Sequence, residues 1–241
     1  MGRIPAQPFS RTLAILGLLV MAAGLGGVDR STYSASIHLN HPGTVDPADF
    51  YHRTILFWDA CRIPATPYAG VLIYLLIVGF HPKGIRAANL CLIAFLAAGA
   101  VTYLLQHTVG RIRPNQAHTW LEFAGPIRGW TEHLPVCFPS GEATASFALA
   151  AIVAWCVPRM AWIVFAAASL TAAARIVPGC HYLADVAAGG IVGGGVVTLM
   201  LRRLKAWARA EDPDIARPDR DKSRTVEQID GTHPGISGGA V

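Results

Sequence analysis

Charged residues are scarce in this chain. Asp, Glu, Lys and Arg make up 15% of its 241 residues, whereas a soluble domain carries about a quarter. Hydrophobic residues make up 53%, the mean hydropathy is +0.41, and the apolar residues are clustered in blocks instead of surrounding a single core. This composition excludes a soluble enzyme and predicts a membrane protein.

Cysteine is also rare, and the excess of positive charge is small. The five cysteines are dispersed and form no CxxC pair, which excludes a disulfide-rich scaffold and a structural zinc site. The net charge is only +5, and the basic residues lie mostly at the ends of loops. Such placement is typical of membrane topology signals, so we expect no nucleic-acid partner.

Long apolar runs supply the predicted fold. About 20 apolar residues cross a hydrocarbon core of roughly 30 Å. Arg3 and Arg11 precede the first run, but no small-residue cleavage site follows it, so an uncleaved anchor is predicted instead of a secretory signal. Six spans are predicted, at residues 12–29, 66–81, 86–105, 142–158, 160–177 and 183–201.

Lys and Arg are concentrated in the segments that are cytoplasmic when both termini lie inside. This bias predicts an integral protein of a bacterial inner membrane with both termini in the cytoplasm. Residues 1–11 are the predicted cytoplasmic N-terminus, and residues 12–207 the membrane domain. Residues 208–241 mix charge with Pro, Gly and Ser, which predicts a disordered cytoplasmic tail.

Glycines in the last predicted span form two overlapping GxxxG patterns, which allow helices to approach closely. The residues are Gly189, Gly190, Gly193 and Gly194. We expect them to pack helices within one chain. A homodimer through the Gly189 and Gly193 face is the alternative.

Three polar clusters lie at the outer ends of the predicted spans. They are GRIRP at residues 110–114, FPSGE at residues 138–142, and Arg175 with His181 and Asp185. Because the six-span topology turns all three toward one compartment, we expect them to form one site.

Each cluster contains groups that suit phosphate chemistry. Arg113 and Arg175 can grip phosphate oxygens with two N–H groups, although a lone arginine at a span end more often anchors lipid headgroups. Ser140 and Gly141 precede a helix whose first amides attract anions, although ordinary capping by Ser140 is the simpler explanation.

His181 and Asp185 are four residues apart, on one helical face. Asp185 can fix the tautomer of the imidazole, which makes His181 a candidate nucleophile.

Together the clusters resemble the signature of the type 2 phosphatidic acid phosphatase family of integral membrane lipid phosphatases. That signature reads Lys-x6-Arg-Pro, Pro-Ser-Gly-His and Arg-x5-His-x3-Asp. The third part is matched in full, and the first through Arg113 and Pro114. Gln106 stands at the lysine position and Glu142 at the histidine position. The resemblance covers roughly residues 55–205.

The resemblance implies an all-α, six-helix membrane bundle with its active site at the outer, periplasmic face. It implies metal-independent hydrolysis of a lipid phosphomonoester or an isoprenyl or other lipid diphosphate, with no cofactor. His181 would attack phosphorus and form a phosphohistidine, and Asp185 would orient it. The implied phosphate-binding groups are Arg113, Arg175, Gln106 and the amides around Ser140 and Gly141.

The two departures leave three interpretations of Glu142. It acts as a protonated general acid, it only stabilises a helix N-terminus while a good leaving group departs without it, or the protein binds lipid phosphate without turnover. The last interpretation describes a non-catalytic lipid-phosphate-binding membrane protein. Cys137 and Cys180, beside the second and third clusters, are a possible disulfide in an oxidising compartment.

Overall fold

The computed structural model describes residues 8–31, 33–34, 56–82 and 84–211. Within these ranges the chain is helical apart from turns and two isolated β-bridges, so the all-α prediction is confirmed. The helices are α1 (Pro8–Ala23), α4 (Pro67–Phe80), α5 (Gly84–Val109), α6 (Gly125–Thr131), α7 (Gly141–Cys156), α8 (Ala161–Ile176) and α9 (Leu183–Glu211). A π-helical turn, Gly24–Val28, follows α1. Each of the six predicted spans overlaps one of these helices, and the first, residues 12–29, also includes the π-helical turn.

Among the described residues, three helical segments are long and apolar enough to cross a membrane: Gly84–Val109, Pro158–Ile176 and Leu183–Arg203. Helices α4 and α7 are apolar but shorter, at 14 and 16 residues. Local signals set their lengths. Thr66 and Ser140 cap their N-termini, and prolines soon follow their C-termini, where a helix cannot continue.

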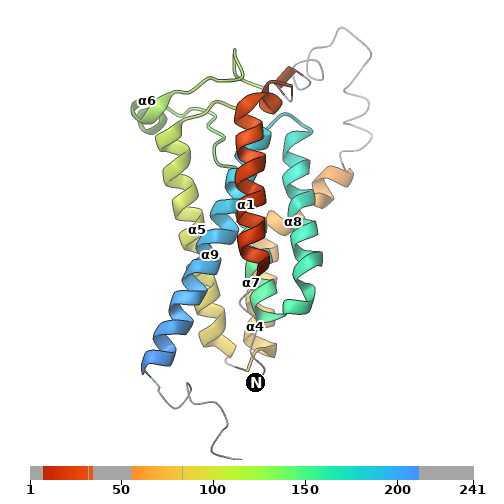
Figure 1. Ribbon diagram of the computed structural model, residues 1–241, viewed down its shortest axis with the longest axis vertical. Coiled ribbons are helices and arrows are strands. Elements are labelled where there is room, and N and C mark those ends of the chain that lie inside the picture. The colour runs from red at the N-terminus through yellow and green to blue at the C-terminus, as the bar shows by residue number, and fades with distance from the viewer. Residues whose placement is uncertain (1–7, 32, 35–55, 83, 212–241) are drawn as a thin grey trace, which may run out of the picture. The chain divides into compact units, whose positions relative to one another are not determined.

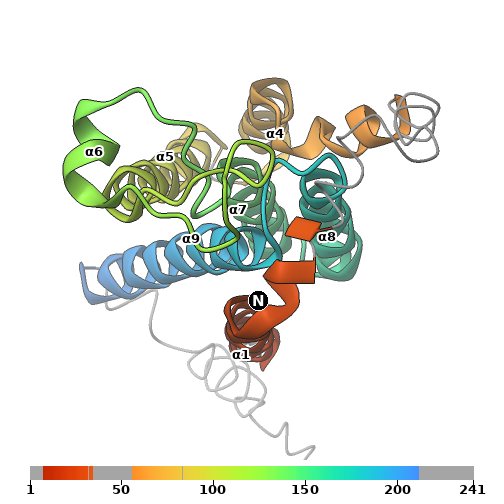
Figure 2. The ribbon, with the colours of Figure 1, turned by 90° about the horizontal axis from the view of Figure 1, so that it is seen from above.

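Small residues fill the interior, and large apolar residues face outward. Helix α7 lies among α4, α5, α8 and α9 (Figure 2). Ala94 and Ala98 of α5 and Ala148 of α7 are fully buried, whereas Leu72 and Leu96 are 58% exposed. This arrangement suits helices that associate in lipid, where close packing of small residues stabilises contacts and large side chains face acyl chains.

The glycines of α9 pack against α7 of the same chain. A Cβ on Gly189 would lie 3.0 Å from the Ala143 Cβ, and one on Gly193 would overlap the Thr144 carbonyl oxygen. The face that carries these glycines is therefore occupied, which confirms packing within one chain. The alternative of a homodimer through this face is wrong, because no space is left for a second helix there.

Residues 1–201 form one compact unit and residues 202–241 another. Of the second unit, only the last part of α9 is described, and it stays helical through Glu211. Most of the predicted cytoplasmic segments, residues 1–7 and 212–241, lie outside the described residues.

Replacing Gly193 with alanine should destabilise the bundle, because the new methyl group forces α9 away from α7. Overpacking of this kind costs about 1–3 kcal/mol, which thermal unfolding in detergent would detect as a lower midpoint. Gly194→Ala is the matched control, since nothing lies within 4 Å of a Cβ at that position. Equal midpoints for the two variants would contradict the close contact.

Candidate active site

The predicted site residues gather at one end of the bundle, where α5 and α8 end and α7 and α9 begin (Figure 1). Gln106 lies in the last turn of α5, and Ser140 caps α7. Arg175 lies in the last turn of α8, and Asp185 in the first turn of α9. The structure thus brings the three clusters together.

A buried arginine that is not part of the family signature holds this end of the bundle. Arg111 is fully buried, and its guanidinium lies 2.8 Å from Asp185 Oδ1 and 3.0 Å from Asp29 Oδ2. It also donates to the Trp120 carbonyl at 3.2 Å and lies 3.8 Å from the centre of the Tyr182 ring. Although burial lowers the pKa of Arg111, its ion pairs with Asp185 and Asp29 raise the pKa above the ordinary value, so the group stays charged.

Main-chain contacts extend this network. Asp29 Oδ1 accepts a hydrogen bond from the Ala184 amide at 3.1 Å, which joins the segment after α1 to the start of α9. The loop between α5 and α7 is held by β-bridges from Arg111 to Phe123 and from Ile112 to Val136. Both carboxylates of the network are fully buried.

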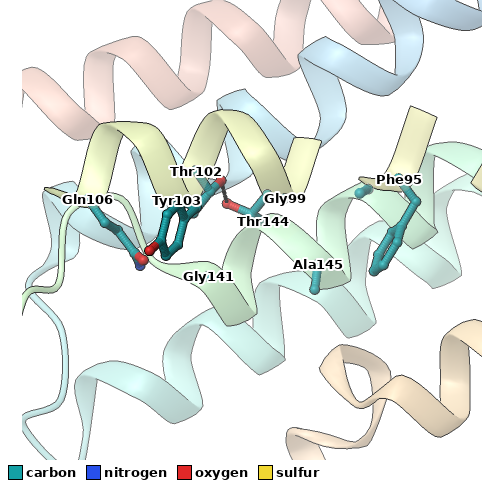
Figure 3. Close-up of a pocket in the computed structure, with 9 residues that line it drawn as sticks. Phe95, Gly99, Thr102, Tyr103, Gln106, Gly141, Thr144 and Ala145 are labelled. Atoms are coloured by element: carbon teal, nitrogen blue, oxygen red, sulfur yellow. Dashed lines mark hydrogen bonds between the residues drawn. The ribbon is translucent and has the colours of Figure 1, made fainter. Parts of the chain in front are cut away.

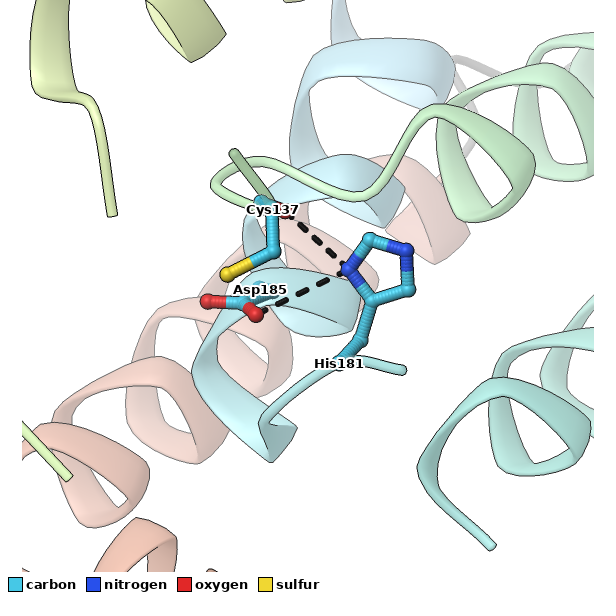
Figure 4. Close-up of side chains that lie close together, drawn as sticks. All are labelled: Cys137, His181 and Asp185. Atoms are coloured by element: carbon cyan, nitrogen blue, oxygen red, sulfur yellow. Dashed lines mark hydrogen bonds and ion pairs between the residues drawn. The ribbon is translucent and has the colours of Figure 1, made fainter. Parts of the chain in front are cut away.

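His181 is oriented by one hydrogen bond and lies near one carboxylate. Its Nδ1 lies 3.1 Å from the Cys137 carbonyl oxygen and 3.7 Å from Asp185 Oδ2. A carbonyl oxygen only accepts, so the shorter contact assigns the proton to Nδ1 and leaves a lone pair on Nε2. Figure 4 shows Nε2 pointing away from both partners. The sequence predicted that Asp185 orients the imidazole. In the structure Asp185 Oδ2 accepts a hydrogen bond from the Tyr182 amide at 2.9 Å, and the Cys137 carbonyl binds the imidazole.

Glu142 bridges two arginines. Its Oε2 lies 2.7 Å from Arg175 Nε, an ion pair whose angle is not that of a hydrogen bond. Its Oε1 accepts from Arg62 Nη2 at 3.0 Å, and Oε2 from Arg62 Nε at 3.4 Å. This hydrogen bonding raises the pKa of Arg62 above its ordinary value. Both oxygens of Glu142 therefore face cations.

Arg113 has an unused donor. Its amide donates to the Pro135 carbonyl at 3.1 Å, which fixes the backbone. Its Nε is buried and has no hydrogen-bond partner among the described residues. The carbonyl of the preceding residue, Ile112, accepts a hydrogen bond from the Cys137 thiol at 3.4 Å, so the Arg113 backbone lies beside the loop that holds His181. A buried donor of this kind suits an anionic ligand.

The amide of Ser140 is not available to a phosphate, which corrects the sequence prediction. It donates to the Asp185 carbonyl at 2.9 Å, and the Ser140 hydroxyl accepts from the Ala143 amide. Ser140 therefore caps α7 and ties it to α9. Gly141 is exposed at the first position of α7, where the amide has no partner within the helix.

Gln106 does not replace the lysine charge of the signature. Its amide Nε2 donates to the Pro139 carbonyl at 2.8 Å and so supports the loop before α7. Close to Gly141, it remains at the edge of the site (Figure 3).

Cys137, His181 and Asp185 place potential metal ligands within 4.8 Å of one another. A metal requires the thiolate of cysteine, but burial raises the pKa of the Cys137 thiol strongly. Asp185 already accepts from Arg111 and from a main-chain amide. This donor set does not fit a metal ion. Cys137 and Cys180 are both free thiols, so the possible disulfide is not formed.

A cavity of about 240 Å³ extends from the site between α5 and α7 (Figure 3). Two residues of the predicted site, Gln106 and Gly141, line it. Its other lining residues are mostly small or apolar: Phe95, Gly99, Thr102, Tyr103, Thr144, Ala145 and Ala148. The Thr102 hydroxyl donates a hydrogen bond of 2.9 Å to the Thr144 hydroxyl. These two polar groups of the cavity wall therefore satisfy each other.

Sequence reasoning missed Asp29, Arg62 and the buried role of Arg111. An acidic residue at the end of a long apolar run was the available signal for Asp29, because a charge there needs a partner. Arg111 lies inside the GRIRP cluster, but nothing local separates it from Arg113. Arg62 carried no signal of its own.

Comparison with known proteins identifies the family and the fold. Residues 87–209 match the family model described as the PAP2 superfamily. The fold is similar to the crystal structure of a transmembrane PAP2 type phosphatidylglycerolphosphate phosphatase from Bacillus subtilis. The TM-score is 0.55 at 17% sequence identity, over 82% of this chain and 96% of that one, a likeness that shows the fold alone. Comparison with curated protein sequences gives no match.

Replacing Arg111 with alanine should destabilise the protein by about 3–5 kcal/mol, because it leaves two buried carboxylates without their cation. Chemical or thermal unfolding in detergent measures this loss. Arg128→Ala is the matched control, since the ion pair of Arg128 with Glu132 is exposed and its loss should have little effect. An Arg111 variant as stable as the control would refute the structural role of the buried network.

Proposed function

Because this chain belongs to the PAP2 superfamily, we propose that it is a metal-independent membrane phosphatase that hydrolyses a lipid-linked phosphomonoester or diphosphate through a phosphohistidine. The observation that carries the proposal is the orientation of His181, whose Nδ1 is bound to a carbonyl and whose Nε2 points away from that carbonyl and from Asp185. A histidine fixed in this way presents a nucleophilic lone pair without a search over ring orientations.

In the first step, the Nε2 lone pair of His181 attacks phosphorus, and the bond from phosphorus to the leaving oxygen breaks. Arg113 and Arg175 hold the equatorial oxygens, with the Gly141 amide as a further donor, and stabilise the charge that spreads over them. In the second step, water attacks phosphorus, and the nitrogen–phosphorus bond breaks. Inorganic phosphate leaves, and His181 returns to its starting form.

The ion pairs of Glu142 favour the second interpretation of that residue. Both of its oxygens face guanidinium groups, so the carboxylate serves as an anchor for Arg62 and Arg175. The leaving group then takes its proton from water or departs as a stable anion. When the terminal phosphoryl group of a lipid diphosphate passes to His181, the leaving group is a stable lipid monophosphate anion, so Glu142 as a structural residue fits a diphosphate better than a simple phosphomonoester.

The cavity between α5 and α7 supports a lipid substrate. It begins beside Gln106 and Gly141 and continues along small and apolar residues toward Phe95 and Ala148. A hydrocarbon chain bonded to the phosphate can enter it while the phosphate meets Arg113 and Arg175.

We place the site at the periplasmic face of a bacterial inner membrane. The basic residues of the chain favour a cytoplasmic location for both termini, and the site residues all lie at one end of the helices. In this arrangement the membrane domain of residues 12–207 crosses the membrane six times, through α1, α4, α5, α7, α8 and α9, and residues 208–241 form a cytoplasmic tail.

The central test is phosphate release by the detergent-purified protein from a panel of lipid phosphates and diphosphates, with EDTA present. We expect release in EDTA and a loss of at least about a thousandfold in His181→Ala, because no other group replaces the nucleophile. His133→Ala is the control, since His133 is exposed. A folded protein that releases no phosphate from any lipid would favour the non-catalytic binding protein.

A second test fills the cavity. Gly99→Leu places a side chain in open space along the wall and should displace one or two methylene groups of a bound chain. At about 0.8 kcal/mol for each buried methylene, kcat/KM for long-chain substrates should fall about 4- to 15-fold. The value for a short-chain analogue should not change. Gly70→Leu, on α4 and away from the cavity, is the control; an equal loss for both chain lengths would refute the lipid-binding role.

A further inference from the structure

Arg62 lies outside the family signature and outside the residues that match the family model, 87–209. It follows the short helix that ends at Cys61 and precedes the turn Ile63–Ala65. The Cys61 carbonyl accepts a hydrogen bond of 2.6 Å from the buried Thr171 hydroxyl of α8. Thr171 lies one turn before Arg175, so the same stretch of α8 holds both arginines at the site.

The two arginines share one carboxylate. Arg62 contacts Glu142 through Nη2 and Nε, and Arg175 contacts it through Nε. Asp59 contacts only Arg62 Nη1, at 3.2 Å, and its side chain is 52% exposed, so solvent screens that pair. Two guanidinium groups facing one shared carboxylate leave a net positive charge beside the site.

The site needs such a charge. The family signature places a lysine where this chain has Gln106, whose amide is engaged with a main-chain carbonyl. Glu142 adds a negative charge where the signature has histidine. If Arg62 were absent, only Arg113 and Arg175 would face a phosphate dianion. Glu142 would then cancel one of their two positive charges.

We propose that Arg62 is a further phosphate-binding residue that supplies the positive charge missing at Gln106. Glu142 is then a positioning residue that holds Arg62 beside Arg175. The Arg62 side chain is 39% exposed, so its guanidinium retains N–H groups for a ligand after its bonds to Glu142. For its lipid substrate this inference rests on the proposed function, but phosphate binding tests it separately.

The first experiment measures binding of inorganic phosphate by calorimetry to the full chain that carries His181→Ala, so that no covalent step intervenes. Adding Arg62→Ala should weaken phosphate binding at least about tenfold, because a charge-assisted contact is lost. Arg62→Lys should recover part of the affinity. Arg128→Ala is the matched control, an arginine also paired with a glutamate through two contacts, and it should not change the affinity.

A double variant separates phosphate binding from simple neutralisation of Glu142. If Arg62 only neutralises that carboxylate, Arg62→Ala with Glu142→Gln should bind phosphate as tightly as Glu142→Gln alone. If Arg62 contacts phosphate, the double variant stays at least about tenfold weaker than Glu142→Gln alone. Restored binding in the double variant, or unchanged binding in Arg62→Ala, would overturn the inference, as would a parent protein that binds no phosphate.

The lipid assay distinguishes this inference from the proposed function. With His181 present, Arg62→Ala should raise KM for the lipid phosphate more than it lowers kcat, because the contact exists before the reaction. Phosphate binding that depends on Arg62 in a protein that hydrolyses no lipid would support the inference and refute the function. Hydrolysis that depends on His181 but has an unchanged KM in Arg62→Ala would support the proposed function and refute the inference.

Discussion

A buried guanidinium organises the described part of this molecule. Arg111 has no access to solvent, and a charge in such a place is stable only with partners that replace its water. The protein supplies Asp29 from the segment after α1, Asp185 from α9, and the face of the Tyr182 ring. Parts of the chain that are far apart in sequence are therefore fixed to one another at the end of the bundle that carries the site.

The position of His181 follows from this network. One carboxylate oxygen of Asp185 accepts a hydrogen bond from Arg111, and the other accepts from the Tyr182 amide. These two contacts fix the first turn of α9. The carbonyl of Asp185 accepts from the Ser140 amide, so α7 is held against α9 where Gly189 allows close approach. The imidazole then donates to the Cys137 carbonyl, and its second nitrogen is left for chemistry. The contacts that pack α7 against α9 therefore also determine how His181 is oriented.

Much of the fold could be predicted from the sequence, because hydropathy and chain length determine where helices form in a membrane protein. All six predicted spans overlap helices, and the packing of Gly193 against α7 follows from the small size of glycine. The contacts within the site were harder to predict from the sequence. The signature located His181, Arg113 and Arg175, but the pairing of Arg111 with Asp29 joins positions far apart in the chain. Local sequence does not encode such a contact, and for the same reason it could not show that the Ser140 amide is occupied or that Arg62 reaches Glu142.

The most direct test of this account is the position of the phosphoryl group in a trapped intermediate. Rapid alkaline quenching of the protein with a labelled lipid phosphate, followed by peptide mapping and separation of the two phosphohistidine isomers, identifies both the residue and the ring nitrogen. The orientation of the ring predicts phosphorylation of His181 on Nε2, since Nδ1 is bound to the Cys137 carbonyl. Phosphorylation on Nδ1, on another residue, or on no residue during active turnover would contradict it.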